Sequence, residues 1–264
     1  MSNPEIRKIV IIGAGRLAIN LSMVIHKKGY ELAEVCNRSE IPGKALAKRV
    51  NAHYIPMPGM ITPDADLYIV CVSDAVIEEV LSKINTDHFI VHTSGTVGID
   101  VLKKVSQNYG VLYPLQTFTF NRLNDCRTVP LCIEANTENN LEILKHFAES
   151  LSENVYVANS GQRRILHLSA VFANNFTNFM YSISQELLKE NEMDFRILAP
   201  IIMQTAENAS SMDIFELQTG PAVRGDMDTI RKHQELLSNH PEYKEIYDLI
   251  TRNIIQLKMN HEQL

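Results

Sequence analysis

The stretch IRKIVIIGAGRLAINLSMVIHKKGYELAEVCNRS, residues 6–39, decides the fold. Lys8–Ile12 is a short apolar run rich in β-branched residues, which predicts a strand buried on both faces. A turn follows at once that matches the dinucleotide fingerprint G-x-G-x-x-G/A. The six residues of this turn are Gly13, Ala14, Gly15, Arg16, Leu17 and Ala18. An amphipathic helix over 16–28 and a terminating Gly29 complete the context, so we expect the helix N-terminus to hold a pyrophosphate.

The end of the second strand, Glu31–Cys36, indicates which dinucleotide binds. A cofactor without a 2′-phosphate usually meets an Asp or Glu at this point. The chain instead has Asn37, Arg38 and Ser39, and an arginine can clamp a phosphate through a planar, charged fork. We therefore predict NADP rather than NAD. The alternative is a glycine turn that only packs helix on strand, with Arg38 as a solvated surface charge.

Composition narrows the class of protein. The 264 residues are 45% hydrophobic and 21% charged, enough for a sizeable core. A net charge of −6 argues against nucleic acid or an anionic membrane as the main partner. No segment approaches the roughly 20 apolar residues of a membrane span, and MSNPEIRK lacks the core of a signal peptide. The four cysteines have no C-x-x-C spacing, so we expect free thiols, no metal site and a cytoplasmic protein. These are Cys36, Cys71, Cys126 and Cys132.

Strands alternate with helices up to about residue 159, and no convincing strand follows. This pattern predicts an α/β fold: a Rossmann-type, doubly wound, mostly parallel sheet over 1–159, then a smaller all-α domain over 160–264. Helical periodicity runs through Gln162–Lys189 as one long helix. The segment Asp213–Asp226 reads as a loop. The other elements expected are strands over 66–72, 89–92, 111–113, 130–134 and 154–157 and helices over 42–50, 75–84, 101–105, 139–151, 195–208, 229–238 and 241–259.

Ligands of open parallel sheets bind at the carboxyl ends of the strands. The candidates there are Val72 and Ser73 beside a ribose, and Ser94 with His92 near the nicotinamide. Ser73 can equally cap the helix that follows it. His92 can equally be a core histidine with satisfied hydrogen bonds.

The long helix carries a polar stripe. At roughly 100° per residue, His167, Asn174 and Asn178 fall within about 20° of one another. Buried polar groups need partners, and a substrate carbonyl or carboxylate would supply them. We select His167 as proton donor, because its unperturbed pKa lies near 6.5, and Asn174 beside it. The alternative is a helix–helix or dimer contact.

A third cluster lies in the loop TGPAVRGD, residues 219–226. Arg224 can hold a substrate carboxylate. It can also pair with Asp226 to fix the loop, or lie at a subunit interface.

These stretches together resemble one family. The fingerprint at 13–18 with Asn37-Arg38-Ser39, YPLQTF at 113–118, His167, and TGP with RGD at 219–226 are similar to the Rossmann-like proteins that carry a DUF2520 domain, which are classed as NADP oxidoreductases. Their plan is similar to that of pyrroline-5-carboxylate reductase, 6-phosphogluconate dehydrogenase and ketopantoate reductase. The resemblance implies a helical domain that forms a homodimer and an active site between the domains. The sequence departs from this plan at one point: sugar-acid dehydrogenases of the superfamily carry a lysine four residues before the helix asparagine, whereas Ala170 and Val171 stand there in this chain.

The expected function is therefore an NADP-dependent oxidoreductase that transfers hydride to or from a small carbonyl, alcohol or imine, with no nucleic-acid or membrane partner. The alternative is a non-catalytic NADP-binding sensor or a dimeric scaffold. The residues leave the substrate, the reaction direction and the roles of Arg224, Asp226 and His92 open.

Overall fold

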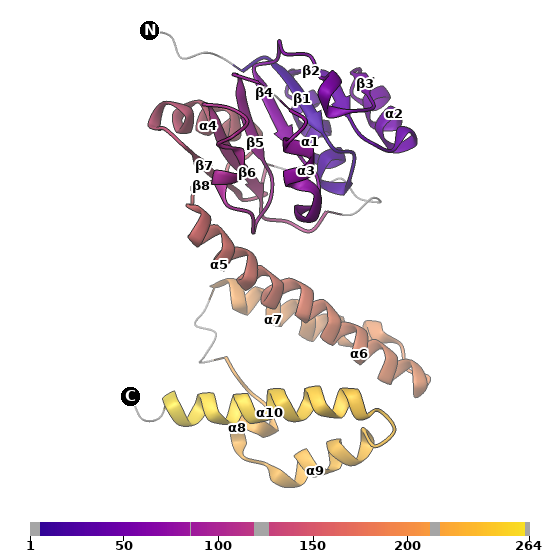
Figure 1. Ribbon diagram of the computed structural model, residues 1–264. Helices are drawn as coiled ribbons and strands as arrows, with labels where there is room; N and C mark the ends of the chain where they lie inside the picture. The colour runs from indigo at the N-terminus through magenta and orange to yellow at the C-terminus, as the bar shows by residue number, and fades with distance from the viewer. Residues whose placement is uncertain (1–5, 85, 119–126, 212–216, 262–264) are drawn as a thin grey trace. The chain divides into compact units, whose positions relative to one another are not determined.

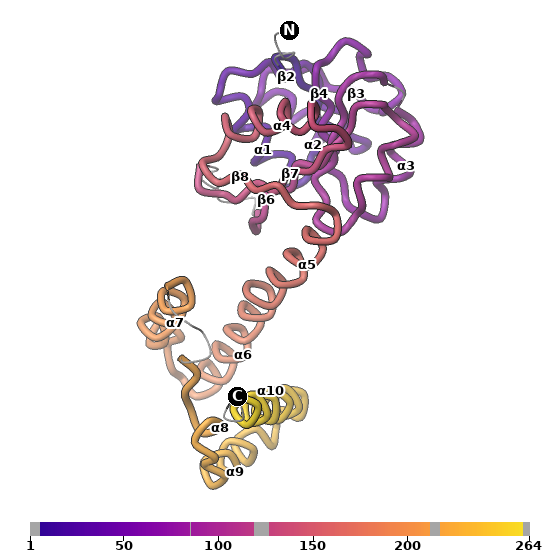
Figure 2. Tube along the Cα trace, turned by 90° about the vertical axis from the view of Figure 1, so that its left-hand side faces the viewer, coloured from indigo at the N-terminus to yellow at the C-terminus, as the bar shows by residue number. Residues whose placement is uncertain are grey.

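A computed structural model describes residues 6–84, 86–118, 127–211 and 217–261. The chain divides into two compact units, Met1–Asn174 and Asn175–Leu264 (Figures 1 and 2). The expected free thiol Cys126 and the beginning of the expected loop Asp213–Asp226 lie outside the described residues.

The first unit is built on one sheet, with eight strands in the described part of the chain (Figure 1). The strands are β1 (Lys8–Ile12), β2 (Glu31–Cys36), β3 (His53–Ile55), β4 (Leu67–Val70), β5 (Phe89–His92), β6 (Tyr109–Pro114), β7 (Leu131–Ala135) and β8 (Val155–Val157). Their order is β3-β2-β1-β4-β5-β6-β7-β8. All neighbours are parallel except β6 and β7. The predicted doubly wound, mostly parallel sheet is confirmed, and its order reverses between β1 and β4, where such folds bind ligands.

Alternation along the strands divides the core between the two faces of the sheet. Ile9 and Ile11 face the cluster that contains α1 (Arg16–Lys27), α2 (Glu40–Arg49) and α4 (Glu138–Leu151). Val10 and Ile12 face the cluster that contains α3 (Ile77–Leu81). Because both faces are covered, the central strands β1, β4 and β5 are mostly apolar, which is why the sequence shows them as hydrophobic runs.

Some helix boundaries differ from the expected ones. Asp74–Val76 is a 3₁₀ turn that precedes a short α3, and Ile99–Leu102 is a 3₁₀ turn in place of the expected helix over 101–105. Ser73 stands at the N-cap position but makes no side-chain cap hydrogen bond. The carboxylate of Asp74 instead accepts a hydrogen bond from the Thr96 hydroxyl. The α-helix expected over 75–84 is therefore confined to α3.

The long helix has a break in its hydrogen-bond pattern that the sequence did not predict. It consists of α5 (Ser160–Ala170), a π-helical segment (Val171–Phe176) and α6 (Thr177–Glu190). A capping box begins it, in which Asn159 accepts from the Gln162 backbone and the Gln162 side chain accepts in return. A π-helix bonds i to i+5, so a rotation of 100° per residue does not carry across it. The expected alignment of Asn178 with His167 is therefore wrong.

The second unit is helical in its described residues. It holds α6, a 3₁₀ turn (Phe195–Leu198), α7 (Ala199–Ser211), α8 (Pro221–Arg224), α9 (Met227–Leu236) and α10 (Pro241–His261). Within it, α8, α9 and α10 lie together (Figure 2), and His233 of α9 contacts the Tyr247 hydroxyl of α10 at 2.9 Å.

The loop expected over Asp213–Asp226 contains a short helix, α8, and this corrects the prediction. Gly220 and Gly225, at φ 109° and 67°, bound α8 in conformations that favour glycine. Asp226 then caps α9 by accepting from the Thr229 backbone at 3.1 Å. A hydrogen bond from the Thr229 hydroxyl at 2.7 Å, together with the one from its backbone N–H, holds the pKa of Asp226 below its usual range.

Candidate functional site

The glycine turn after β1 requires glycine at its first position. Gly13 has φ 119°, and a Cβ there would lie 2.5 Å from the Cys71 carbonyl oxygen at the end of β4. A Cβ on Gly15 would meet nothing within 4 Å, so the turn is open on that side. Ala18 is fully buried in the core. The helix that follows has no side-chain cap at Gly15, which leaves its positive end facing the open side of the turn.

A hollow of about 420 Å³ lies beside this turn. Its walls include Gly13, the three residues Asn37, Arg38 and Ser39 that follow β2, and Val72 after β4. The Asn37 side-chain amide donates to the Ser39 carbonyl at 2.7 Å and so fixes the turn that presents Arg38. The structure therefore brings together the fingerprint and the strand-end residues that the sequence selected.

The hollow is also lined by charged residues that the sequence analysis did not use. Glu79 of α3 and Lys83 both line it, and their side chains pair at 2.6 Å. Lys83, and to a lesser extent Arg38, lowers the pKa of Glu79. The hollow thus contains two cations and one carboxylate. Lys83 is four residues after Glu79, which in sequence reads as an ordinary exposed helix pair.

The residues after β5 mainly support one another. The Ser94 hydroxyl accepts from the backbone N–H groups of Thr96 and Val97, at 3.1 and 3.0 Å. The Ser94 N–H donates to Nδ1 of His92 at 3.2 Å. His92 is fully buried, and among the described residues its Nε2 has no hydrogen-bond partner.

Burial, reinforced by the positive charge of Arg163, lowers the pKa of His92 to about 4, while the Gly98 carbonyl acts in the opposite direction. His92 is therefore neutral at pH 7.

The two polar residues chosen on the long helix both contact the segment that follows β6. The Tyr113 hydroxyl lies 3.0 Å from Nδ1 of His167. Nδ2 of Asn174, in the π-helical segment, donates to the Thr117 hydroxyl at 2.7 Å. Both helix residues therefore form hydrogen bonds with the segment Tyr113–Thr117. The sequence did not predict the contact between Tyr113 and His167, because a tyrosine at the end of a strand normally indicates a residue of the hydrophobic core.

Arg163, one turn before His167, is a further residue that the sequence did not reveal. Its side chain is fully buried and forms an ion pair with Glu134 of β7. It also donates to the carbonyl of Ser94 at 3.1 Å and to that of Val97 at 2.6 Å. The adjacent Arg164 is exposed, and no feature of the sequence distinguishes the two arginines.

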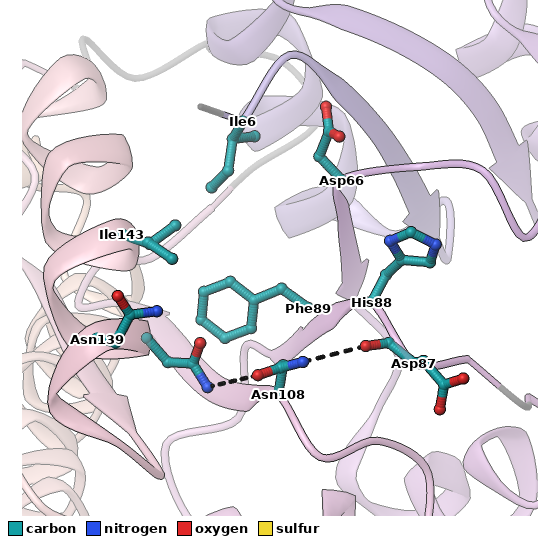
Figure 3. A pocket seen from close by; sticks show the side chains of 9 residues that line it. Ile6, Asp66, Asp87, His88, Phe89, Asn108, Asn139 and Ile143 are labelled. Atoms are coloured by element: carbon teal, nitrogen blue, oxygen red, sulfur yellow. Dashed lines mark hydrogen bonds between the residues drawn. The ribbon is translucent and has the colours of Figure 1, made fainter. Parts of the chain in front are cut away.

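A second hollow, of about 220 Å³, lies at the opposite edge of the sheet (Figure 3). Its polar groups are engaged with the protein itself. Asp66 accepts from the Lys8 N–H at 2.8 Å, and Asn140 donates to Asn108, which donates to the Asp87 carbonyl. We therefore assign these residues to the support of the strand ends.

Two further features of the described residues bear on the class of protein. They contain no group of three or more metal-ligating His, Cys, Asp or Glu side chains. Nor does any helix in this part of the chain combine the length and hydrophobicity needed to cross a bilayer.

Comparison with known proteins places the chain in a family. A Rossmann-like domain matches residues 2–117, and a domain of unknown function, DUF2520, matches residues 129–254. A crystal structure of a putative NADP oxidoreductase from Bacteroides fragilis is 36% identical, with a TM-score of 0.88, over 97% of this chain and 100% of that one. The chain belongs to the DUF2520 family of Rossmann-like proteins. The expected family resemblance is confirmed.

Other similar structures share the fold of this DUF2520 protein at lower identity. A protein of Thermotoga maritima is 21% identical, with a TM-score of 0.73, over 96% of this chain and 99% of that one. An imine reductase from Myxococcus stipitatus in complex with NADP⁺ is 13% identical, with a TM-score of 0.69, over 94% of this chain and 93% of that one. Among curated proteins, none matches the sequence.

Proposed function

We propose that this DUF2520 protein is an NADP-dependent oxidoreductase that transfers a hydride between the nicotinamide and a small carbonyl, alcohol, imine or amine substrate. One observation carries the proposal. The glycine turn, the hollow with Arg38, and the Tyr113–His167 contact all lie at the carboxyl edge of one parallel sheet, where such folds bind their ligands. The Bacteroides fragilis relative, itself described as a putative NADP oxidoreductase, supports it.

The residues along this edge fit a dinucleotide phosphate. The residues 13–18 would hold the pyrophosphate, because Gly15 leaves the start of α1 open. Asn37, Arg38 and Ser39 would hold the 2′-phosphate in the hollow, which Lys83 also lines. Val72, Ser73 and Ser94 follow along the edge toward the nicotinamide.

The cofactor, when bound, supplies the hydride. His167 would exchange the proton with the substrate heteroatom, because the ring nitrogens of an imidazole can both donate and accept a proton. Asn174 gives one N–H to Thr117, which leaves its carbonyl oxygen and second N–H to orient the substrate.

Calorimetric titration with NADPH and NADH tests the cofactor assignment. We expect Arg38→Ala to weaken NADPH binding roughly tenfold to a hundredfold, the worth of one charged hydrogen-bond pair, and to leave NADH binding unchanged. Arg49→Ala is the matched control, because Arg49 is exposed on α2 and does not line the hollow. Equal losses for both cofactors would exclude the 2′-phosphate role of Arg38.

A turnover screen with NADPH and small keto acids, aldehydes and cyclic imines tests the reaction. Once a substrate is found, His167→Ala should lower kcat by about a hundredfold or more, the usual contribution of a general acid. Tight NADPH binding without turnover of any substrate would favour a cofactor-binding sensor or scaffold instead.

We also propose that the protein forms a homodimer through its helical unit. Neither α6 nor α7 has a single buried residue, although Phe179, Ile201 and Met203 are apolar and 47%, 63% and 72% exposed. Short helices gain most of their stability from packing an apolar face. A second copy, meeting this surface in an isologous contact, would supply that packing.

Light scattering after size-exclusion chromatography tests the dimer. The wild type should have twice the mass of the chain, and Ile201→Glu should shift it toward the monomer. Arg196→Glu, which alters an exposed polar residue before α7, is the control. A monomeric wild type at micromolar concentration would contradict the proposal.

A further inference from the structure

Tyr113 and His167 form the most specific side-chain contact at the carboxyl edge of the sheet. Besides the 3.0 Å hydrogen bond to Nδ1, the rings meet edge to face, with centroids 6.1 Å apart and an interplanar angle of 61°. Tyr113 ends β6 and is buried, whereas His167 is only partly buried. Of the two, His167 is therefore the side chain that a small molecule can reach.

The direction of the hydrogen bond depends on the tautomer of His167, because a hydroxyl can donate or accept. Among the described residues, Nδ1 of His167 is the partner that the Tyr113 hydroxyl has. Burial raises the pKa of Tyr113 to about 12, so the hydroxyl keeps its proton at neutral pH. A neutral imidazole that accepts at Nδ1 carries its own proton on Nε2.

The backbone at Gly95 packs against the rings of both Tyr113 and His167. A Cβ on Gly95 would lie 2.8 Å from Nδ1 of His167 and 2.9 Å from Cζ of Tyr113, so the chain passes directly against the pair. Arg163 bonds the carbonyls on either side of this point, those of Ser94 and Val97. The turn of α5 that carries His167 is thereby fixed to the loop after β5.

We propose that Tyr113 is a positioning residue, which fixes the ring orientation and the neutral tautomer of His167 so that Nε2 is the atom that meets the substrate. The inference rests on the proposed function only for the identity of that substrate. It assigns to Tyr113 a role through His167 and no contact with the substrate.

The proton balance is consistent with this geometry. A bound nicotinamide would supply the hydride to the substrate carbon, and the substrate heteroatom would then need a proton. That atom takes the Nε2 proton of the His167 imidazolium. The ring that this transfer leaves is the Nδ1–H tautomer, opposite to the resting one, and its Nδ1 proton donates to the Tyr113 oxygen; protonation of Nε2 and loss of the Nδ1 proton return the resting tautomer. A hydroxyl donates in one state and accepts in the other, so Tyr113 serves both. A solvent proton then restores the imidazolium.

NMR of the full chain labelled with ¹⁵N-histidine tests the inference without turnover. The His167 signals are assigned by their loss in His167→Gln. At a pH where the ring is neutral, we expect a bare Nδ1 and a protonated Nε2 in the wild type. In Tyr113→Phe the two shifts should move toward each other, as a mixture of tautomers gives. Unchanged shifts in Tyr113→Phe would overturn the inference.

Tyr109→Phe is the matched control, because Tyr109 lies on the same strand and packs against a different core cluster. It should leave the His167 shifts unchanged, and circular dichroism should show that both variants fold. With a substrate in hand, Tyr113→Phe should lower kcat by about tenfold while KM changes less than about twofold, as expected for a lost alignment of the general acid. A change in KM alone would contradict the positioning role. A protein that lacks turnover but shows the Tyr113-dependent tautomer would refute the proposed function and leave this inference standing.

Discussion

Arg163 of α5 and Glu134 of β7 form a buried ion pair in which the arginine side chain has no exposed surface and the glutamate side chain is 15% exposed. Ser160, which begins α5, also donates to Glu134, at 2.8 Å. The pair therefore fixes the first turns of α5 to the sheet. His167 lies one turn further along the same helix, so its place beside Tyr113 depends on this ion pair.

Arg163→Leu should be among the most destabilising single changes in the chain. Removing one member of a buried pair leaves the other charge uncompensated, at a cost of about 3–5 kcal/mol. Urea unfolding followed by far-ultraviolet circular dichroism measures this, since the chain has no tryptophan. Arg196→Leu breaks an exposed pair with Asp194 and should change the midpoint little. Similar midpoints for the two variants would show that the buried pair does not anchor α5.

Gly95→Ala should impair activity while the protein remains folded. The added Cβ would stand 2.8 Å from Nδ1 of His167, so the ring must move away from Tyr113. We expect kcat to fall about tenfold through this misplacement. Gly98→Ala in the same loop is the control, because a Cβ there meets nothing within 4 Å. Equal kcat values for the two variants would contradict the expected crowding.

Lys83→Gln should weaken NADPH binding by about fivefold and leave NADH binding unchanged, because an exposed cation contributes modestly to a charged hydrogen bond. Lys83 lines the same hollow as Arg38. The control is Lys44→Gln, which removes the same kind of i,i+4 pair, with Glu40, away from the hollow. Calorimetric titration distinguishes them. If Lys44→Gln lowers the NADPH affinity as much as Lys83→Gln does, the loss reflects the overall charge of the protein and not a contact between Lys83 and the cofactor.

His92 should make the protein sensitive to acid. Its pKa is about 4 in the folded chain, below the ordinary value of 6.5. Folding is therefore unaffected by this group above pH 6.5, and stability is lost as the pH falls, because the unfolded chain binds the proton first. Between pH 6.5 and 5 the loss is about 2 kcal/mol.

Urea midpoints at pH 7 and pH 5 measure this sensitivity. His92→Gln should lose less stability over that interval than the wild type. His146→Gln, on the exposed face of α4, should behave as the wild type does. An equal loss in His92→Gln and the wild type would refute the assignment.

Much of the first unit follows from the sequence. The bounds of β1, β2 and β5 agree with the prediction residue for residue, and β1 and β5 are the hydrophobic runs expected of strands covered on both faces. The sequence also explains why Gly13 and Arg38 line one hollow, since the residues that follow parallel strands meet at one edge of the sheet. The prediction failed at the π-helical segment Val171–Phe176, which has no signature in residue type. It also failed at α8, whose four residues are too few to show periodicity.

The sequence alone determined the alternation of strand and helix, the glycine turn and the place of Arg38 after the second strand, because each depends on local patterns of polarity and backbone freedom. Only the tertiary structure decided which arginine of the Arg163–Arg164 pair is buried and that Tyr113 meets His167. Those contacts join residues more than 25 positions apart, and a long-range contact depends on how the elements pack. The glycine turn of residues 13–18 can therefore be predicted from the sequence, whereas the contacts that surround His167, the expected proton donor, depend on the fold.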